Sequence, residues 1–295
     1  DFAAFSRPDY LVDRAPGRLG QPLAGLADAE LADFLDGQAD FRNRETPATG
    51  LGPIFNDVSC LACHGQPASG GASRITVTRF GRASADGFDP LDHLGGSLLQ
   101  ARSLGGVPRE VVPAEANVVA RRLTTPLFGA GLLEAIPDQA IMDYARAPKP
   151  AGIRGKVAIV TDVITGEERV GRFGWKAQHA SLLAFSADAY LNEMGITNRF
   201  FPTENAPNGD RTVLARFDRS ADPEDIIDPL TGEGDVDRVA TYMRLLAPPA
   251  RGAARGNSTR GGQIFAAIDC AACHRPVMAT GTNPIAALNE QPVEL

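Results

Sequence analysis

The chain has 295 residues, of which 43% are hydrophobic and 22% charged, so it is long enough for two or three domains with a substantial buried core. Its formal net charge of −7 argues against a nucleic-acid partner. Only three residues are lysine, so arginine supplies most of the positive charge and is available to pair with carboxylates. No run approaches the ~18 apolar residues of a membrane-spanning helix, and we expect no membrane span.

The N-terminal part leads into a cysteine motif. Residues 1–25 contain Pro and Gly without periodicity and are expected to form an extended arm. Apolar positions among acidic residues predict an amphipathic helix over residues 26–41, with Asp28 as its N-cap, and a loop follows over residues 42–51.

Residues 52–64 and 262–274 form a repeat. Both copies carry Gly, Ile, Phe, Cys, Ala, Cys and His at the same offsets, and together they contain all four cysteines: Cys60, Cys63, Cys270 and Cys273. Each copy ends in Cys-x-x-Cys-His, the attachment signature of c-type haem, in which two thiols bond the porphyrin. The adjoining His64 and His274 are then the expected proximal iron ligands.

Two other interpretations of the cysteines remain open. A Cys-x-x-Cys pair also occurs in redox dithiols, and two pairs can form a four-cysteine zinc site. Zinc ligands usually come in closely spaced pairs, however, and neither alternative requires a His after both second cysteines. We therefore expect two covalently attached haems c as the cofactors.

The region between the motifs contains few strong patterns before residue 127. We expect a short strand over residues 74–80, a Gly-rich irregular segment over 81–112 that includes His93, and a short helix over 113–123. An apolar stretch at 127–136 then precedes a helix that begins at Pro137 and ends near Arg146.

The second half of this region is more regular. β-Branched residues predict a hairpin between 156–164 and 168–173, followed by a long helix over 177–194 that Gly195 ends in a left-handed conformation. Residues 198–232 are expected to be mostly irregular. A helix over 236–246 and a linker over 250–259 then lead to the second motif, whose helix begins near Ser258.

These elements predict a mainly α protein made of tandem cytochrome c-like modules. The first haem module with its N-terminal arm spans residues 1–110, and a middle segment that docks the haems and contains the small β-hairpin spans 111–250. Residues 251–295 are the start of a second module. Only 21 residues follow His274, so we expect this module to be incomplete and the natural polypeptide to continue beyond Leu295.

Several strings of the sequence resemble one bacterial family. They include Cys60 to Gly65, Phe128 to Leu132, Arg172 to Ala177, Glu193 to Thr197 and Cys270 to His274. In this order they resemble the dihaem oxidoreductase family, whose members are described as peroxidases or thiol oxidoreductases and are similar in architecture to dihaem cytochrome c peroxidases. The resemblance implies that one haem stores an electron while the other, with an open sixth position, reacts with peroxide.

The remaining candidates are individual side chains with two interpretations each. His179 is a candidate distal ligand or a surface residue, His93 is a weaker candidate, and Met194 is expected in the core. Trp175 is a candidate electron relay between the haems or a buried packing residue.

The charged candidates lie in or near the family strings. Arg172 and Lys176 are candidates for pairing with haem propionates, or for surface ion pairs. Glu134 and Glu193 are possible acid or base groups, or helix-surface carboxylates.

The sequence thus predicts a dihaem c-type oxidoreductase that is peroxidase-like and takes electrons from a small redox protein. The alternatives are an electron-transfer cytochrome without catalysis and oxidation of a small thiol or sulfur compound. Covalent haem c is made outside the bacterial cytoplasm, so we expect the periplasm. The chain begins at Asp1 and not at Met, as expected if a signal peptide has been removed or if the start of the polypeptide is not included.

Overall fold

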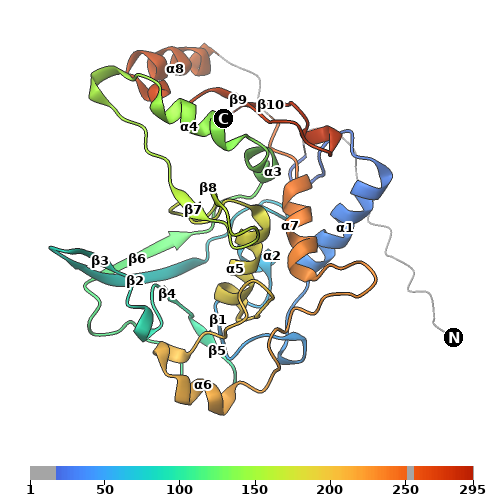
Figure 1. The fold of residues 1–295 in the computed structure, drawn as a ribbon, viewed down its shortest axis with the longest axis vertical. Helices are drawn as coiled ribbons and strands as arrows, with labels where there is room; N and C mark the ends of the chain where they lie inside the picture. The colour runs from blue at the N-terminus through green and yellow to red at the C-terminus, as the bar shows by residue number, and fades with distance from the viewer. Residues whose placement is uncertain (1–17, 251–255, 295) are drawn as a thin grey trace.

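The computed structural model describes residues 18–250 and 256–294. Figure 1 shows α5 at the centre, α1 and α7 side by side along one flank, and a twisted sheet on the other. The helices in the described ranges are α1 (Asp28–Arg42), α2 (Cys60–Cys63), α3 (Ala130–Glu134), α4 (Asp138–Arg146), α5 (Leu182–Met194), α6 (Arg211–Phe217), α7 (Asp235–Leu245) and α8 (Gly256–Ala267).

Small sheets accompany these helices. The strands in the same ranges are β1 (Ile54–Phe55), β2 (Thr76–Ser84), β3 (Gly87–Asp89), β4 (Leu98–Leu99), β5 (Arg102–Ser103), β6 (Val118–Leu123), β7 (Ile159–Thr161), β8 (Glu168–Val170), β9 (Val277–Ala279) and β10 (Pro292–Glu294). The prediction of a mainly α protein is therefore wrong. The structure is 34% helical and 16% strand, and its strands form several separate sheets that the expected class does not include.

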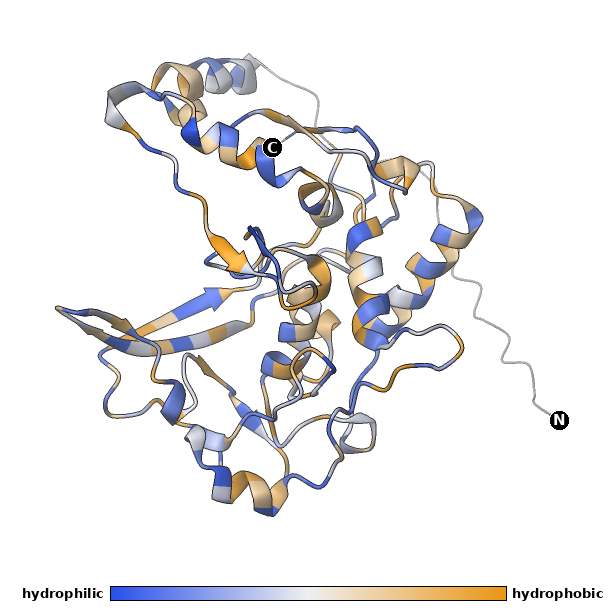
Figure 2. Ribbon diagram, viewed as in Figure 1, coloured by the Kyte–Doolittle hydropathy of each residue, from blue (hydrophilic) through white to orange (hydrophobic). Residues whose placement is uncertain are grey.

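The core is built where α1 crosses α7. The Tyr242 ring lies between two phenylalanines of α1, with its centroid 5.0 Å from that of Phe34 and 4.9 Å from that of Phe41. All three side chains are buried. Figure 2 shows hydrophilic and hydrophobic residues alternating along α1, as expected of a helix with one buried face. Leu182, Tyr190 and other residues of α5 complete the same cluster.

The largest sheet is centred on β2. Strands β3, β4 and β6 all pair antiparallel with it, and the β2–β6 ladder runs from Thr76 opposite Leu123 to Gly81 opposite Val118. The helix predicted for residues 113–123 is thus wrong, because its second half is strand β6. Cross-strand hydrogen bonds to a segment some forty residues away decide this conformation, and local propensity does not record them.

Several sequence predictions of helices and turns are confirmed. Helices α1, α4 and α7 lie within two residues of the expected ranges, the β7–β8 hairpin forms, and Gly195 ends α5 with φ +66°.

The starts of two helices differ from the prediction. Asp28 is the first residue of α1, and Ala27 is its N-cap. Helix α5 begins at Leu182, after Ser181 caps it by accepting a hydrogen bond from the Ala184 N–H, so His179 precedes the helix.

The C-terminal segment packs against α3 and α4. Strands β9 and β10 form an antiparallel pair, and Leu288 and Val293 join Leu132 and Ile136 in a small second core. Figure 1 places α8 beside α4 at the upper edge of the molecule. Among the described residues, every helix is too short or too polar to cross a bilayer.

Candidate haem sites

The first cysteine motif occupies a single helical turn. Helix α2 runs from Cys60 to Cys63, and the Ser59 side chain caps it by accepting a hydrogen bond from the Ala62 N–H at 3.3 Å. Strand β1 precedes the motif and is fixed by pairing with β5. Residues four apart on such a turn share a face, so Cys60 and His64 lie on the same side of the motif.

The imidazole of His64 is held by the backbone. Its Nδ1 lies 3.0 Å from the carbonyl oxygen of Gly71, and its ring centroid lies 6.2 Å from that of Phe41. Burial lowers the pKa of His64, whereas hydrogen bonds to the backbone of Gly71 and Thr125 act to raise it. The ring is therefore neutral, and an Nδ1–H donated to Gly71 leaves Nε2 with the lone pair that binds a metal.

The thiols of this motif are not activated. Burial raises the pKa of Cys60 to about 12, and it raises that of Cys63 to about 11, with the charges of Glu193 and Asp57 adding to the shift of Cys63. A redox dithiol needs a lowered thiol pKa. The surroundings of Cys60 and Cys63 thus do not favour the dithiol interpretation.

A cavity of about 590 Å³ adjoins the first motif. This volume is in the range of small-molecule sites. Its wall includes Phe34 and Arg42 of α1, Leu61 of the motif, and the segment 65–69 except Pro67. Leu61 and Ala62 of the motif line it, but Cys60, Cys63 and His64 do not, so the cavity is not assigned to a haem.

The second motif is more exposed than the first. Cys270 to Ala272 form a short 3₁₀ turn after α8, Cys270 is partly buried, and Cys273 and His274 are exposed. The ring of Phe265 lies 5.8 Å from that of His274. Phe265, Ile264 and Ile268 also expose 40%, 48% and 66% of their surface, so apolar side chains surround this motif without covering it.

Helix α4 holds the second motif in place. The Tyr144 hydroxyl donates a hydrogen bond of 2.8 Å to the carbonyl oxygen of Ala271, inside the motif. The guanidinium of Arg275 lies 5.1 Å from the Tyr144 ring. A cavity of about 510 Å³ lies beside this contact and is lined by Tyr144, Arg275 and Met278, among others. No sequence pattern indicates the role of Tyr144, because its partner lies 127 residues away.

The four-cysteine zinc site is not formed. Tetrahedral thiolates around one Zn²⁺ lie about 3.8 Å from one another. Among the side chains that the structure describes, the one group of three or more potential ligands within 4.8 Å of each other contains no cysteine. The two cysteine pairs therefore remain separate.

The candidate distal ligands have other partners than the first motif's imidazole. His179 Nε2 is 3.5 Å from Asp188 Oδ2, and its ring packs 5.9 Å from that of Phe185. His93 is exposed in a short 3₁₀ turn, and Met194 is 4% exposed within the core. Within the described ranges no contact joins His179 or His93 to either motif, so the distal role of His179 stays a prediction.

Trp175 lies on the surface. It is 51% exposed, and the guanidinium carbon of Arg122 lies 4.7 Å from its ring centroid. This arrangement differs from the buried packing residue that was one of the two sequence interpretations. An exposed ring stacked on an arginine is accessible to a cofactor or a partner, and the relay role stays a prediction.

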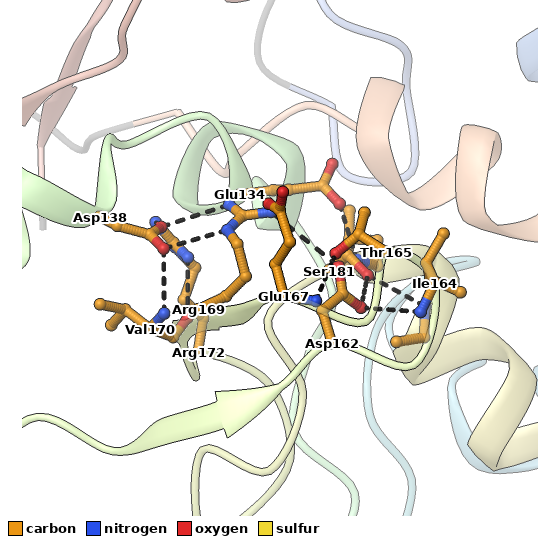
Figure 3. A network of polar contacts seen from close by, with 12 residues as sticks. Glu134, Asp138, Asp162, Ile164, Thr165, Glu167, Arg169, Val170, Arg172 and Ser181 are labelled. Atoms are coloured by element: carbon orange, nitrogen blue, oxygen red, sulfur yellow. Dashed lines mark hydrogen bonds and ion pairs between the residues drawn. The ribbon is translucent and has the colours of Figure 1, made fainter.

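Arg172 belongs to a network inside the protein. Figure 3 shows its side chain directed at Asp138, together with Arg169 of β8. Arg172 Nη2 donates to Asp138 Oδ1 at 2.6 Å and to the carbonyl of Ile136, and its side chain is only 5% exposed. Its guanidinium is thus already paired, whereas Lys176 is exposed.

The two candidate glutamates have different surroundings. Glu134 Oε1 accepts from the N–H of Leu182 at the start of α5, and its carboxylate is paired with Arg244, which gives it a structural role. Glu193 accepts a 2.7 Å hydrogen bond from Asn56 Nδ2. Burial raises the pKa of Glu193, with Asn56 opposing the shift, and its charge acts on Cys63. Glu193 is therefore the candidate acid or base beside the first motif.

Comparison with known proteins connects the larger, C-terminal part of the chain to one family. Residues 111–294, more than half of the chain, match the family described as "Di-haem oxidoreductase, putative peroxidase". No curated protein and no solved structure matches the chain. The match includes the second cysteine motif and the Arg172 to Ala177 string. The chain therefore belongs to the di-haem oxidoreductase family, whose members carry two haems.

Proposed function

We propose that the chain binds both haems covalently, as haem c, through its two Cys-x-x-Cys-His motifs. In this assignment Cys60 and Cys63 would hold one haem and Cys270 and Cys273 the other, while His64 and His274 would supply iron ligands. Addition of each thiol S–H across one vinyl group would form a thioether and would need no oxidant. The observation that supports this most directly is the 3.0 Å contact between His64 Nδ1 and Gly71 O, which orients a neutral imidazole beside two thiols.

The activity that we propose is the reduction of hydrogen peroxide to two water molecules, which consumes two electrons and two protons. Bound haem supplies the redox-active iron for this chemistry. A small redox protein is the proposed electron donor, and electrons pass through one haem to the reactive haem. Trp175 is the proposed relay, because its exposed ring is accessible to a cofactor. Glu193, with its raised pKa, is the proposed proton donor on the side of the first motif. We place the protein in the periplasm, where covalent haem c is made.

Covalent attachment is tested by mass and by spectroscopy. The intact mass of the purified protein should include two haems, and its pyridine haemochrome spectrum should be that of thioether-linked haem. The double variant Cys60→Ser/Cys63→Ser should retain one haem, and so should Cys270→Ser/Cys273→Ser. A wild-type mass with fewer than two haems contradicts the assignment.

Electron paramagnetic resonance of the oxidised and half-reduced protein separates an enzyme from an electron carrier. A peroxidase should show a high-spin haem in one of these states, and that signal should change on addition of peroxide or cyanide. Two low-spin signals that neither reagent alters would contradict peroxidase activity and favour a dihaem electron-transfer cytochrome.

A further inference from the structure

Three carboxylates from two loops meet on the side of the molecule near α6. Glu204 precedes this helix, and Asp222 and Glu224 follow it. One oxygen from each carboxylate lies within 4.8 Å of the other two. The three residues lie outside both cysteine motifs, and the proposed redox function does not use them.

Glu204 is the most unusual of the three. It is only 3% exposed, and its Oε2 has no hydrogen-bond partner, although its Oε1 accepts a 3.0 Å hydrogen bond from the N–H of Asn205. Burial, together with the charge of the neighbouring Glu224, raises the pKa of Glu204 to about 9. A buried carboxylate oxygen without a partner is costly, and it needs either a proton or a cation.

Protein side chains do not supply that cation. In residues 18–250 and 256–294, no lysine or arginine forms an ion pair with Glu204, Asp222 or Glu224. The charge of Asp218 adds further negative potential to Glu204. The loops thus gather several acidic groups at one place, where Arg211 Nη1 donates at 2.8 Å to the backbone carbonyl oxygen of Glu204 and not to a carboxylate of the cluster.

Thr197 fixes the geometry of the cluster. This fully buried residue follows the C-terminus of α5. Its N–H donates to Glu224 Oε2 at 2.7 Å, its hydroxyl donates to the same oxygen, and the hydroxyl also lies 3.2 Å from Asp222 Oδ1. In return, the Glu224 N–H donates to Thr197 Oγ1 at 3.3 Å. Asp222 and Glu224 are therefore held together before any ion binds.

The ligand type selects among cations. Three carboxylate oxygens from the protein, with water completing the shell, suit Ca²⁺, which takes several oxygen ligands in a flexible geometry. Mg²⁺ usually keeps several water ligands and binds only one or two carboxylates. Zn²⁺ prefers nitrogen and sulfur ligands, which are absent from this group. The exposed side of Asp222 leaves a path for the ion and for water ligands.

We propose that Glu204, Asp222 and Glu224 bind one calcium ion. The ion connects the loop that contains Glu204 to the loop between α6 and α7, and both loops to Thr197 at the end of α5. This site is independent of the haem assignment, and its role is structural.

The test is calorimetric titration of the full haem-containing protein, stripped with EDTA, with CaCl₂ and separately with MgCl₂. One Ca²⁺ should bind, with Mg²⁺ at least about 10-fold weaker, and Ca²⁺ should raise the melting temperature. Asp222→Asn, at an exposed position, should lower the Ca²⁺ affinity about 10-fold or more. Glu115→Gln, an exposed carboxylate outside the cluster, is the matched control and should titrate like the wild type.

Glu204→Gln separates ion binding from a purely structural role. Without Ca²⁺ this variant should melt above the stripped wild type, because it removes a buried carboxylate that lacks a partner, and added Ca²⁺ should no longer raise its melting temperature. The proposal is overturned if Ca²⁺ neither binds nor stabilises the wild type, or if Asp222→Asn binds Ca²⁺ as tightly as the wild type does.

Discussion

His64 Nδ1 lies 3.0 Å from the carbonyl oxygen of Gly71, seven residues further along the chain. This contact fixes the ring so that the opposite nitrogen is the available ligand. Gly71 also leaves no room for a side chain, since a Cβ there would lie 2.1 Å from the carbonyl oxygen of Gln66. The turn after the motif therefore sets both the tautomer and the position of the imidazole.

We expect His64→Gly to remove the axial ligand of the first haem while the thioethers keep that haem attached. The absorption of one of the two haems should change, because its iron loses the His64 ligand, and added imidazole should restore it. Absorption and magnetic circular dichroism spectra measure the change. His93→Gly, at an exposed position, is the control. An unchanged spectrum in His64→Gly would show that His64 is not a ligand.

The ion pair between Asp138 and Arg172 should contribute measurably to stability. Asp138→Asn leaves the guanidinium of Arg172, which is 5% exposed, without its carboxylate, so we expect a loss of about 2 kcal/mol in the free energy of unfolding. Urea denaturation at pH 7 measures it. Asp143→Asn is a control on the exposed side of the same helix and should change the stability by less than about 0.5 kcal/mol. Equal losses in the two variants would contradict the role of the pair.

The same carboxylate should make stability depend on pH. Burial acts to raise the pKa of Asp138, but hydrogen bonds from Arg169, Val170 and Arg172 outweigh burial and hold the pKa well below its usual range. A carboxylate whose pKa is lower in the folded state stabilises that state fully when the pH is above the unfolded pKa of about 3.9. This stabilisation is lost as the pH falls from there toward the folded pKa. The stability difference between wild type and Asp138→Asn should thus be constant near neutral pH and shrink below about pH 4. A difference that grows on acidification would contradict the assignment.

The single tryptophan offers a direct test of the proposed relay. Trp175 is 51% exposed, so Trp175→Phe should change stability by less than about 0.5 kcal/mol. If the ring lies between the haems, its fluorescence should be strongly quenched in the haem-containing protein, and the substitution should slow interhaem electron transfer without loss of either haem. Bright fluorescence together with an unchanged transfer rate would remove the relay role.

The sequence predicts the parts of this protein that depend on local pattern. The helices α1, α4 and α7, the β7–β8 hairpin and the left-handed Gly195 all follow from periodicity or from turn residues. Strand β6 does not, because β2 supplies its hydrogen bonds from far along the chain. The Glu204 cluster has no signal either, since its three carboxylates come from irregular loops whose proximity is a property of the fold.

Close backbone contact explains why a glycine lies inside α1. A Cβ at Gly37 would lie 2.0 Å from the carbonyl oxygen of Arg238 in α7. In a free helix, glycine to alanine is favourable by up to about 1 kcal/mol. In Gly37→Ala this contact should reverse the sign, and we expect a destabilisation of about 1–3 kcal/mol from overpacking.

The matched control is Gly261→Ala in α8, where a Cβ meets nothing within 4 Å. This variant should be neutral or stabilised by up to about 1 kcal/mol, because only helix propensity changes. Urea denaturation of both variants measures the difference. If Gly37→Ala were as stable as Gly261→Ala, then α1 and α7 would not approach each other as closely as the structure shows, and the packing of Phe34 and Phe41 against Tyr242 would have to be revised.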